Sequence, residues 1–298
     1  MFMNYISVIG SGTMGNGIAH TFALSGFKVN IIDLSQDRIT EAINTISKNL
    51  DRQLQKGTIT SSQHTEAIGN IQGFTLLEAG VKDADLVIEA ATENVDIKLK
   101  IFADLDKLCK PTAILASNTS SISITKIAAV TARPELVIGM HFMNPVPVMK
   151  LVEVIRGFNT SDKTTNQIMD LSVKIGKVPV EVNDYPGFVA NRILMPMINE
   201  AIQCLNEGVA GVTEIDTVMK LGMSHPMGPL QLADFIGLDV CLAILNVLHQ
   251  GFGNPKYAPS PLLVNMVASG QLGVKSGSGF YDYSAGIKEA VLSKKFKK

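Results

Sequence analysis

Short apolar runs, separated by segments with helical periodicity, dominate residues 5–182 of the chain. Several runs are continuously apolar and rich in Val and Ile, as in strands buried on both faces. Helical patterns lie between them, for instance over 16–25 and 97–108. This alternation predicts a parallel, doubly wound α/β sheet. The expected strands are 5–9, 28–33, 86–90, 113–117, 137–142, 151–155 and 178–182.

A polar segment from residue 37 to about 67 interrupts this alternation. Its pattern predicts a long helix followed by a shorter one, inserted before the sheet resumes. Lys48, Arg52 and Lys56 recur every fourth residue in it and therefore share one face of the long helix. A solvated helix face is the simplest interpretation of Lys48 and Arg52.

A change of pattern near residue 184 predicts a domain boundary. Residues 183–187, Asn-Asp-Tyr-Pro-Gly, are typical of a break between domains. The strand pattern then disappears, and 188–206, 212–221, 229–249 and 261–268 fit helices that end near Gly or Pro. We therefore expect domains at 1–184 and 185–298, the second of them all-α. Residues 193–205 show little polar surface, so this domain is expected to form a homodimer through an apolar face.

Composition and charge narrow the class of protein. Hydrophobic residues make up 46% and charged residues 18% of the 298, which fits globular domains rather than a disordered chain. The net charge of -1 argues against nucleic acid or an anionic membrane as partner. No apolar run is long enough for a membrane span, and the first residues lack the cationic start of a secretion signal.

The cysteine pattern fits a reducing compartment. Cys109, Cys204 and Cys241 are odd in number, form no CxxC pair and lie in apolar patterns. They are interpreted as reduced core residues, so no metal site is expected. A cytoplasmic location follows as the expectation.

A glycine loop follows the first strand and opens the first helix. Asp33 stands at the end of the next strand, eighteen residues beyond the loop. Together these features are typical of a dinucleotide-binding fold of the Rossmann type, in which the helix N-terminus faces the pyrophosphate. The predicted cofactor-binding loop is Gly10, Ser11, Gly12, Thr13, Met14 and Gly15.

The residues around Asp33 favour NAD over NADP. A carboxylate at this position accepts hydrogen bonds from the ribose hydroxyls and repels a 2′-phosphate. No Arg follows immediately, since the next residues are Leu34, Ser35 and Gln36. A glycine-rich turn without a cofactor and an FAD site are the alternatives that the loop leaves open.

Polar residues follow the later strands, where parallel sheets bind ligands. The strand at 86–90 continues to Glu93, and the next one ends in Ser-Asn-Thr-Ser-Ser at 117–121. His141 ends a further strand and Glu153 stands twelve residues on. A carboxylate beside an imidazole orients the ring and favours its protonated form, as in proton-transfer pairs. A structural histidine is the alternative.

Longer motifs carry a family resemblance. They are SNTSS at 117–121, GMHFMNPVPVMKLVEVI at 139–155, PGFVANRILMPMINEA at 186–201, MKLGMSHPMGPLQLADFIGLD at 219–239 and KSGSGFYDY at 275–283. The chain resembles the 3-hydroxyacyl-CoA dehydrogenase family, nearest to its bacterial 3-hydroxybutyryl-CoA members, over roughly the first 284 residues. The resemblance implies an NAD-dependent oxidoreductase that interconverts (S)-3-hydroxyacyl-CoA and 3-ketoacyl-CoA.

The resemblance also implies roles for individual residues. His141 matches the general base, Glu153 its orienting carboxylate, and Ser120 the serine that meets the reacting oxygen and the cofactor. Asn191 matches a substrate-positioning asparagine, and Lys56 a lysine that meets the CoA portion. The matching cofactor contacts are Glu93, Lys98, Asn144 and Lys275.

Two other functions remain open from the sequence. A hydroxy-acid dehydrogenase on the same scaffold would not depend on the CoA portion of its substrate. A non-catalytic protein that kept the NAD site would not need the set of Ser120, His141, Glu153 and Asn191. An assay of NADH oxidation with acetoacetyl-CoA and with a simple keto acid separates all three.

Overall fold

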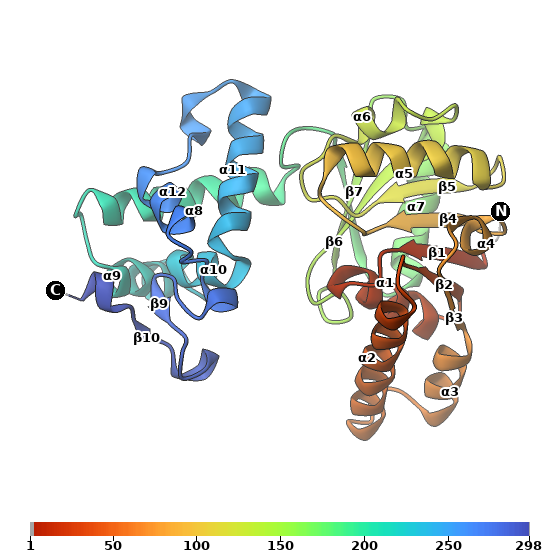
Figure 1. The fold of residues 1–298 in the computed structure, drawn as a ribbon, viewed down its shortest axis with the longest axis horizontal. Coiled ribbons are helices and arrows are strands. Elements are labelled where there is room, and N and C mark those ends of the chain that lie inside the picture. Colours follow the sequence, from red (N-terminus) through yellow and green to blue (C-terminus); the bar gives the residue numbers. More distant parts are fainter. Residues whose placement is uncertain (1–2, 298) are drawn as a thin grey trace. The chain divides into compact units, whose positions relative to one another are not determined.

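An eight-stranded sheet organises the first part of the chain in the computed structural model, which describes residues 3–297 (Figure 1). The order is β3-β2-β1-β4-β5-β6-β7-β8, so the direction of winding changes between β1 and β4. Such a switch opens a crevice at the carboxyl ends of the two strands. The strands are β1 (Tyr5–Ile9), β2 (Lys28–Ile32), β3 (Ile71–Phe74), β4 (Leu86–Glu89), β5 (Ile114–Ser117), β6 (Val137–Phe142), β7 (Leu151–Arg156) and β8 (Val178–Asn183).

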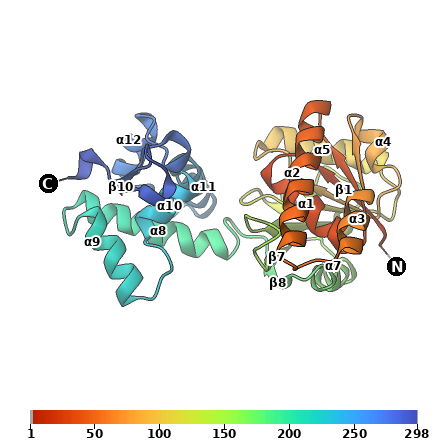
Figure 2. The same ribbon diagram turned by 90° about the horizontal axis from the view of Figure 1, so that it is seen from below.

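Helices cover both faces of this sheet, with α1 on one face and α5 on the other (Figures 1 and 2). The predicted Rossmann-type α/β fold is thereby confirmed. The helices are α1 (Thr13–Leu24), α2 (Gln36–Gln55), α3 (Ser61–Gly69), α4 (Leu77–Val81), α5 (Val95–Leu108), α6 (Ile124–Ala128) and α7 (Asp162–Lys174).

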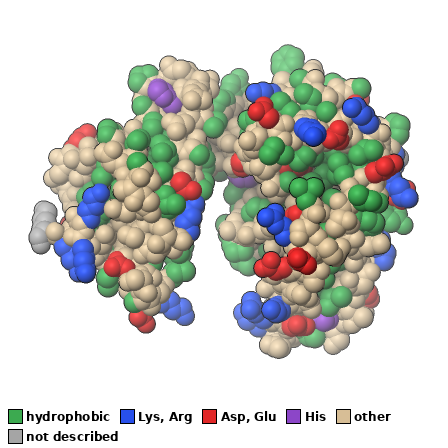
Figure 3. Space-filling model, in the orientation of Figure 1, with side chains coloured by type: hydrophobic (Ala, Val, Ile, Leu, Met, Phe, Trp, Pro, Cys, Tyr) green, Lys and Arg blue, Asp and Glu red, His purple; other side chains and the backbone are tan. Residues whose placement is uncertain are grey.

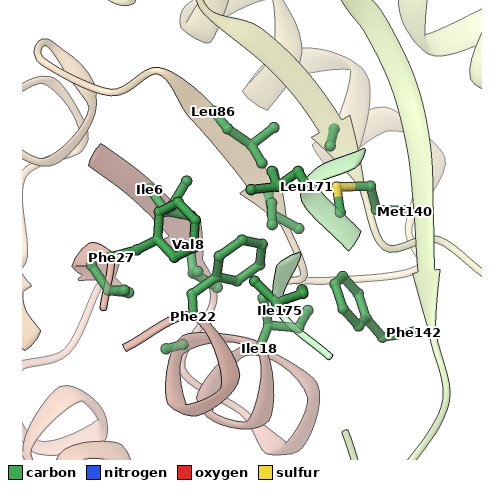
Figure 4. Packing of buried hydrophobic residues seen from close by; sticks show 14 of the residues in the cluster. Ile6, Val8, Ile18, Phe22, Phe27, Leu86, Met140, Phe142, Leu171 and Ile175 are labelled. Carbon is green, nitrogen blue, oxygen red and sulfur yellow. The ribbon is translucent and has the colours of Figure 1, made fainter. Parts of the chain in front are cut away.

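One core ties the glycine loop to the strand that carries His141. Phe22 of α1 is buried, and its ring contacts Phe27 and Phe142 edge-on, with centroids 5.6 and 6.5 Å apart (Figure 4). Burial of such a ring stabilises the fold by about 1.5–3 kcal/mol. Because neighbouring residues of a strand point to opposite faces, His141 points away from this core.

The sheet is not parallel throughout, which corrects the prediction. β6 and β7 pair antiparallel, while all the other neighbouring strands pair in parallel. Only residues 143–150 connect β6 to β7. A parallel crossover needs about a dozen residues or more, so this connection is too short for one.

The structure also adds a strand that the sequence pattern did not predict. The two polar helices α2 and α3 lead into β3, which is short and only half-buried. Gly73 sits in it, and a Cβ there would come within 2.3 Å of Ile39 in α2. The glycine therefore allows the long helix to lie close to the edge of the sheet, and it also weakens the strand signal.

A second compact unit begins at Pro186 and is mainly helical. The expected helix 229–249 is wrong in one respect, because Gly237, with φ 102°, divides it into α10 and α11. The expected helix 212–221 changes at Val218 into a π-helical turn. The helices are α8 (Ala190–Asn206), α9 (Val212–Thr217), α10 (Pro229–Ile236), α11 (Leu238–Phe252) and α12 (Pro261–Ala268).

A small hairpin closes the core of this unit, where the sequence predicted only helices. It consists of β9 (Tyr281–Asp282) and β10 (Val291–Leu292). Phe296 continues from it and lies against Phe280, with ring centroids 5.7 Å apart. Residues 294–297, three of which are lysines, are therefore anchored by one aromatic side chain.

No single helix within residues 3–297 is long and apolar enough to cross a membrane. Helices α10 and α11 would meet the criteria of length and apolarity only when taken together, and they are bent by 96° relative to each other. Figure 3 shows Lys and Arg interspersed with Asp and Glu on the face drawn there.

Two buried carboxyl groups hold the second unit together. Asp216 accepts hydrogen bonds from the backbone of Leu230, at 2.8 Å, and from the hydroxyl of Tyr281, at 2.7 Å. Asp234 accepts from the backbone of Phe280, at 3.1 Å, and of Tyr281, at 2.9 Å. Burial raises the pKa of Asp234 to about 6, although these hydrogen bonds oppose the rise.

The raised pKa predicts a pH-dependent free energy of unfolding. Asp234 binds its proton more tightly in the folded chain than in the unfolded one, where its pKa is 3.8. Its contribution is therefore present in full below the unfolded pKa and is lost as the pH rises through about 6. Denaturant unfolding of the wild type and of Asp234→Asn should show a difference that shifts by about 3 kcal/mol across this window. A difference independent of pH would contradict the assignment.

Candidate functional site

At two of the three loop glycines, a side chain would clash with the backbone of the protein. Gly10 has φ +93°, and a Cβ on it would lie 2.6 Å from the backbone of Ala91. A Cβ on Gly15 would lie 1.8 Å from the carbonyl oxygen of Gly10. Gly12 is different, because a Cβ there would meet no atom within 4 Å. The space beside Gly12 fits the close approach of a pyrophosphate.

The N-terminus of α1 opens directly from this loop. Gly12 is the N-cap, no side chain caps the helix, and its first turn holds no acidic residue. A helix start of this kind presents backbone N–H groups and positive dipole to an anion. These features fit the phosphates of a dinucleotide.

Asp33 is held beside the loop. The backbone N–H and the hydroxyl of Ser11 both donate to Asp33 Oδ2, at 3.0 and 2.8 Å. Burial acts to raise the pKa of Asp33, but these bonds and those from the backbone of Ser35 and Leu34 outweigh it, so the pKa is lowered. Asp33 therefore stays ionised at neutral pH.

A cavity of about 980 Å³ joins these parts. It extends from the glycine loop past Asp33 to the faces of α2 and α5, and it reaches Asn144 in the connection between β6 and β7. A volume at the upper end of the range for ligand pockets suits a dinucleotide. Arg38 also lines the cavity; it stands five residues after Asp33, beyond the three positions in which an arginine was looked for in the sequence.

A buried ionic cluster joins the ends of β4 and β5. Lys98 of α5 is 1% exposed and forms an ion pair with Glu89, which is also fully buried. Ser117 donates to the same carboxylate at 3.0 Å. These contacts bury the ammonium group of Lys98 between Glu89 and Ser117. Its predicted contact with the cofactor stays a prediction.

Glu93 connects the loop after β4 to the loop after β5. Its carboxylate accepts from the hydroxyl of Thr119, at 2.8 Å, and from both the backbone N–H and the hydroxyl of Ser120, at 2.6 and 2.8 Å. Two predicted site residues, Glu93 and Ser120, are thus in direct contact. The hydroxyl of Ser120 is oriented by this carboxylate.

His141 and Glu153 form a hydrogen-bonded pair. They lie directly opposite each other in the antiparallel ladder of β6 and β7, and His141 Nδ1 is 2.7 Å from Glu153 Oε2. Asn118 accepts from the backbone N–H of Phe142 at 2.9 Å and so joins the neighbouring loop to this strand. The pair can hold an imidazole in one orientation with Nδ1 facing the carboxylate.

A buried lysine supports the connection that carries Asn144. Lys177 donates to the carbonyl oxygens of Val146 and Met149, the second at 2.8 Å. Burial lowers the pKa of Lys177. The sequence pattern gave no sign of this role, because Lys177 lies near the start of a distant strand.

Three further predicted residues belong to other elements of the chain. Lys56 is exposed at the C-terminal end of α2. Asn191, in α8, and Lys275 both belong to the second unit, where Lys275 forms an ion pair with Asp239 at 2.5 Å. Their predicted contacts with ligands stay predictions. Within residues 3–297, no cluster of His, Cys, Asp or Glu is arranged to hold a metal ion.

Comparison with known proteins gives matches along nearly the whole chain. Residues 5–185 match the NAD binding domain of 3-hydroxyacyl-CoA dehydrogenase, and residues 187–283 match its C-terminal domain. A probable 3-hydroxybutyryl-CoA dehydrogenase of Bacillus subtilis is 56% identical over 95% of this chain and 98% of its own. The 3-hydroxyadipyl-CoA dehydrogenase of Escherichia coli is 42% identical, over 96% of this chain and 60% of its own.

A solved structure agrees with the sequence matches. The crystal structure of (S)-3-hydroxybutyryl-CoA dehydrogenase from Ralstonia eutropha superposes with a TM-score of 0.92 at 50% identity, covering 95% of this chain and 100% of that one. The predicted NAD cofactor agrees with the matched NAD binding domain. On the two domain matches, the chain belongs to the 3-hydroxyacyl-CoA dehydrogenase family.

Proposed function

We propose that this protein interconverts (S)-3-hydroxybutyryl-CoA and acetoacetyl-CoA with NAD as the hydride carrier. The family membership supports the reaction type, and the names of the relatives from Bacillus subtilis and Ralstonia eutropha support the four-carbon substrate. The Escherichia coli relative, named for 3-hydroxyadipyl-CoA, indicates that the same scaffold accepts longer acyl chains.

The observation that carries this proposal is the contact of His141 with Glu153. Because Nδ1 faces the carboxylate, Nε2 is the nitrogen that exchanges a proton with the C3 hydroxyl of the substrate. During oxidation the neutral imidazole takes that proton, and the carboxylate stabilises the imidazolium that forms. Bound NAD supplies the acceptor for the hydride from C3.

Ser120 would act on the same oxygen atom. Its hydroxyl contacts Glu93, which fixes its orientation at the end of β5. A hydroxyl held in this way can stabilise the changing charge on the reacting oxygen. Asn191 is proposed to position the acyl chain, and Asn144 to contact the cofactor from the cavity wall.

We further propose that the second unit, 185–298, mediates a homodimer. Large apolar side chains are exposed along it, among them Ile193 at 69%, Val209 at 70% and Leu221 at 80%. Exposed apolar patches of this kind mark surfaces that bind another protein. Closed two-fold dimers are the commonest assembly of soluble proteins.

Removal of the imidazole tests the proton-transfer role. His141→Ala should lower turnover by roughly 10²–10⁴-fold, the usual contribution of a general base, with little change in the Kd for NADH. Steady-state rates and a fluorescence titration of NADH measure the two effects. His64→Ala, which alters another histidine with a carboxylate partner, is the matched control and should keep wild-type turnover. Retained turnover in His141→Ala would reject the assignment.

The rates of oxidation and of reduction should depend on pH in opposite ways. Oxidation requires the neutral imidazole and reduction requires the imidazolium, so a rise in pH should speed oxidation and slow reduction. Initial rates in both directions, at saturating substrates, check this. Rates that change in the same direction, or not at all, would contradict a proton transfer by His141.

The CoA portion should be recognised through α2. Lys56→Ala is expected to raise the KM for acetoacetyl-CoA by about tenfold with little change in kcat, because one charged contact with a phosphate is lost. Lys48→Ala, on the same exposed helix face, is the matched control. Lys56 would have no specific role if the KM for acetoacetyl-CoA rose equally in both variants. The same would follow if the wild type reduced a simple keto acid as fast as acetoacetyl-CoA.

A further inference from the structure

Arg38 lines the same cavity as Asp33 and lies beside it. It stands in the first turn of α2, where Ser35 caps the helix and accepts from the backbone N–H of Arg38. Its guanidinium is 4.0 Å from Asp33 Oδ1, and its side chain is 74% exposed while that of Asp33 is 11% exposed. Arg38 is therefore held at the backbone, with a side chain that can turn toward a ligand in the cavity.

Five charged side chains line the cavity, and Asp33 is the carboxylate nearest to the glycine loop. Two cations, Arg38 and Lys100, face three carboxylates, Asp33, Glu41 and Asp104. Among these, Asp33 is the one that contacts the glycine loop, through both donors of Ser11. Replacing it with Asn would leave two cations and two carboxylates around the cavity, with Arg38 released from its partner.

We propose that Arg38 is a cation already placed to bind a ribose 2′-phosphate once the carboxylate of Asp33, which repels that phosphate, is removed. A guanidinium presents paired donors that match phosphate oxygens, and the exposed side chain of Arg38 reaches the space in which Asp33 Oδ1 would otherwise meet a ribose hydroxyl. This inference rests on the preference for NAD that was expected from Asp33.

Arg38 bears on which substitutions would change the choice of cofactor. On sequence grounds, a switch toward NADP would call for the loss of Asp33 together with the gain of an arginine nearby. The structure assigns that arginine to Arg38, so the loss of the carboxylate should suffice. Preference between the two cofactors is then a balance between two neighbouring side chains.

Nucleotide fragments test this balance without any turnover. Calorimetry at low ionic strength would give the Kd of 5′-AMP and of adenosine 2′,5′-bisphosphate, which differ by the 2′-phosphate alone. The wild type should prefer 5′-AMP. In Asp33→Asn the ratio of the two Kd values should shift by about tenfold or more toward the bisphosphate, and the shift should shrink at high salt. The ratio cancels any loss of affinity common to both fragments.

Double variants identify the cation responsible. Asp33→Asn with Arg38→Ala should lose most of the shift, whereas Asp33→Asn with Lys100→Ala, which removes the other cation of the cavity, should keep it. An unchanged ratio in Asp33→Asn, or a loss of the shift with Lys100→Ala instead, would overturn the proposal. Because neither fragment reacts, these outcomes are independent of whether the protein acts on 3-hydroxyacyl-CoA.

Discussion

The reversal of the chain between β6 and β7 is the constraint on which the site depends. It sets His141, near the end of one strand, directly opposite Glu153, near the start of the next. Both side chains thereby reach the edge of the sheet at which β1, β4 and β5 end. Had β7 run parallel to β6, its early residues would lie at the far edge of the sheet.

The loops at this edge are fastened to one another by buried polar contacts. Glu89 is bound by Lys98 and Ser117, Glu93 holds Ser120, and Asn118 accepts from the backbone beside His141. A buried ion pair gives little net stability, but removal of one partner leaves a costly charge. We infer that these contacts position Ser120 and His141, the residues proposed to react, rather than add to the free energy of folding.

Much of the fold was predictable because its signals are local. The buried strands are continuous apolar runs, and the glycine loop and Asp33 follow from spacing alone. Strand β3 was not predictable in this way. It holds Gly73, and the need for a glycine there arises from the approach of Ile39, which is distant in the sequence. The reversal at β6 was missed although residues 143–150 are too few for a crossover. Arg38 and Lys177 needed three-dimensional contacts to be noticed.

Nitrogen NMR of the His141 ring tests the central claim most directly, because it reports which ring nitrogen carries the proton. In the protein at a pH where the ring is neutral, the contact with Glu153 Oε2 predicts a proton on Nδ1 and none on Nε2, leaving Nε2 able to accept the proton of a substrate hydroxyl. A proton on Nε2 of the neutral ring would contradict the account, since no base would then face the substrate.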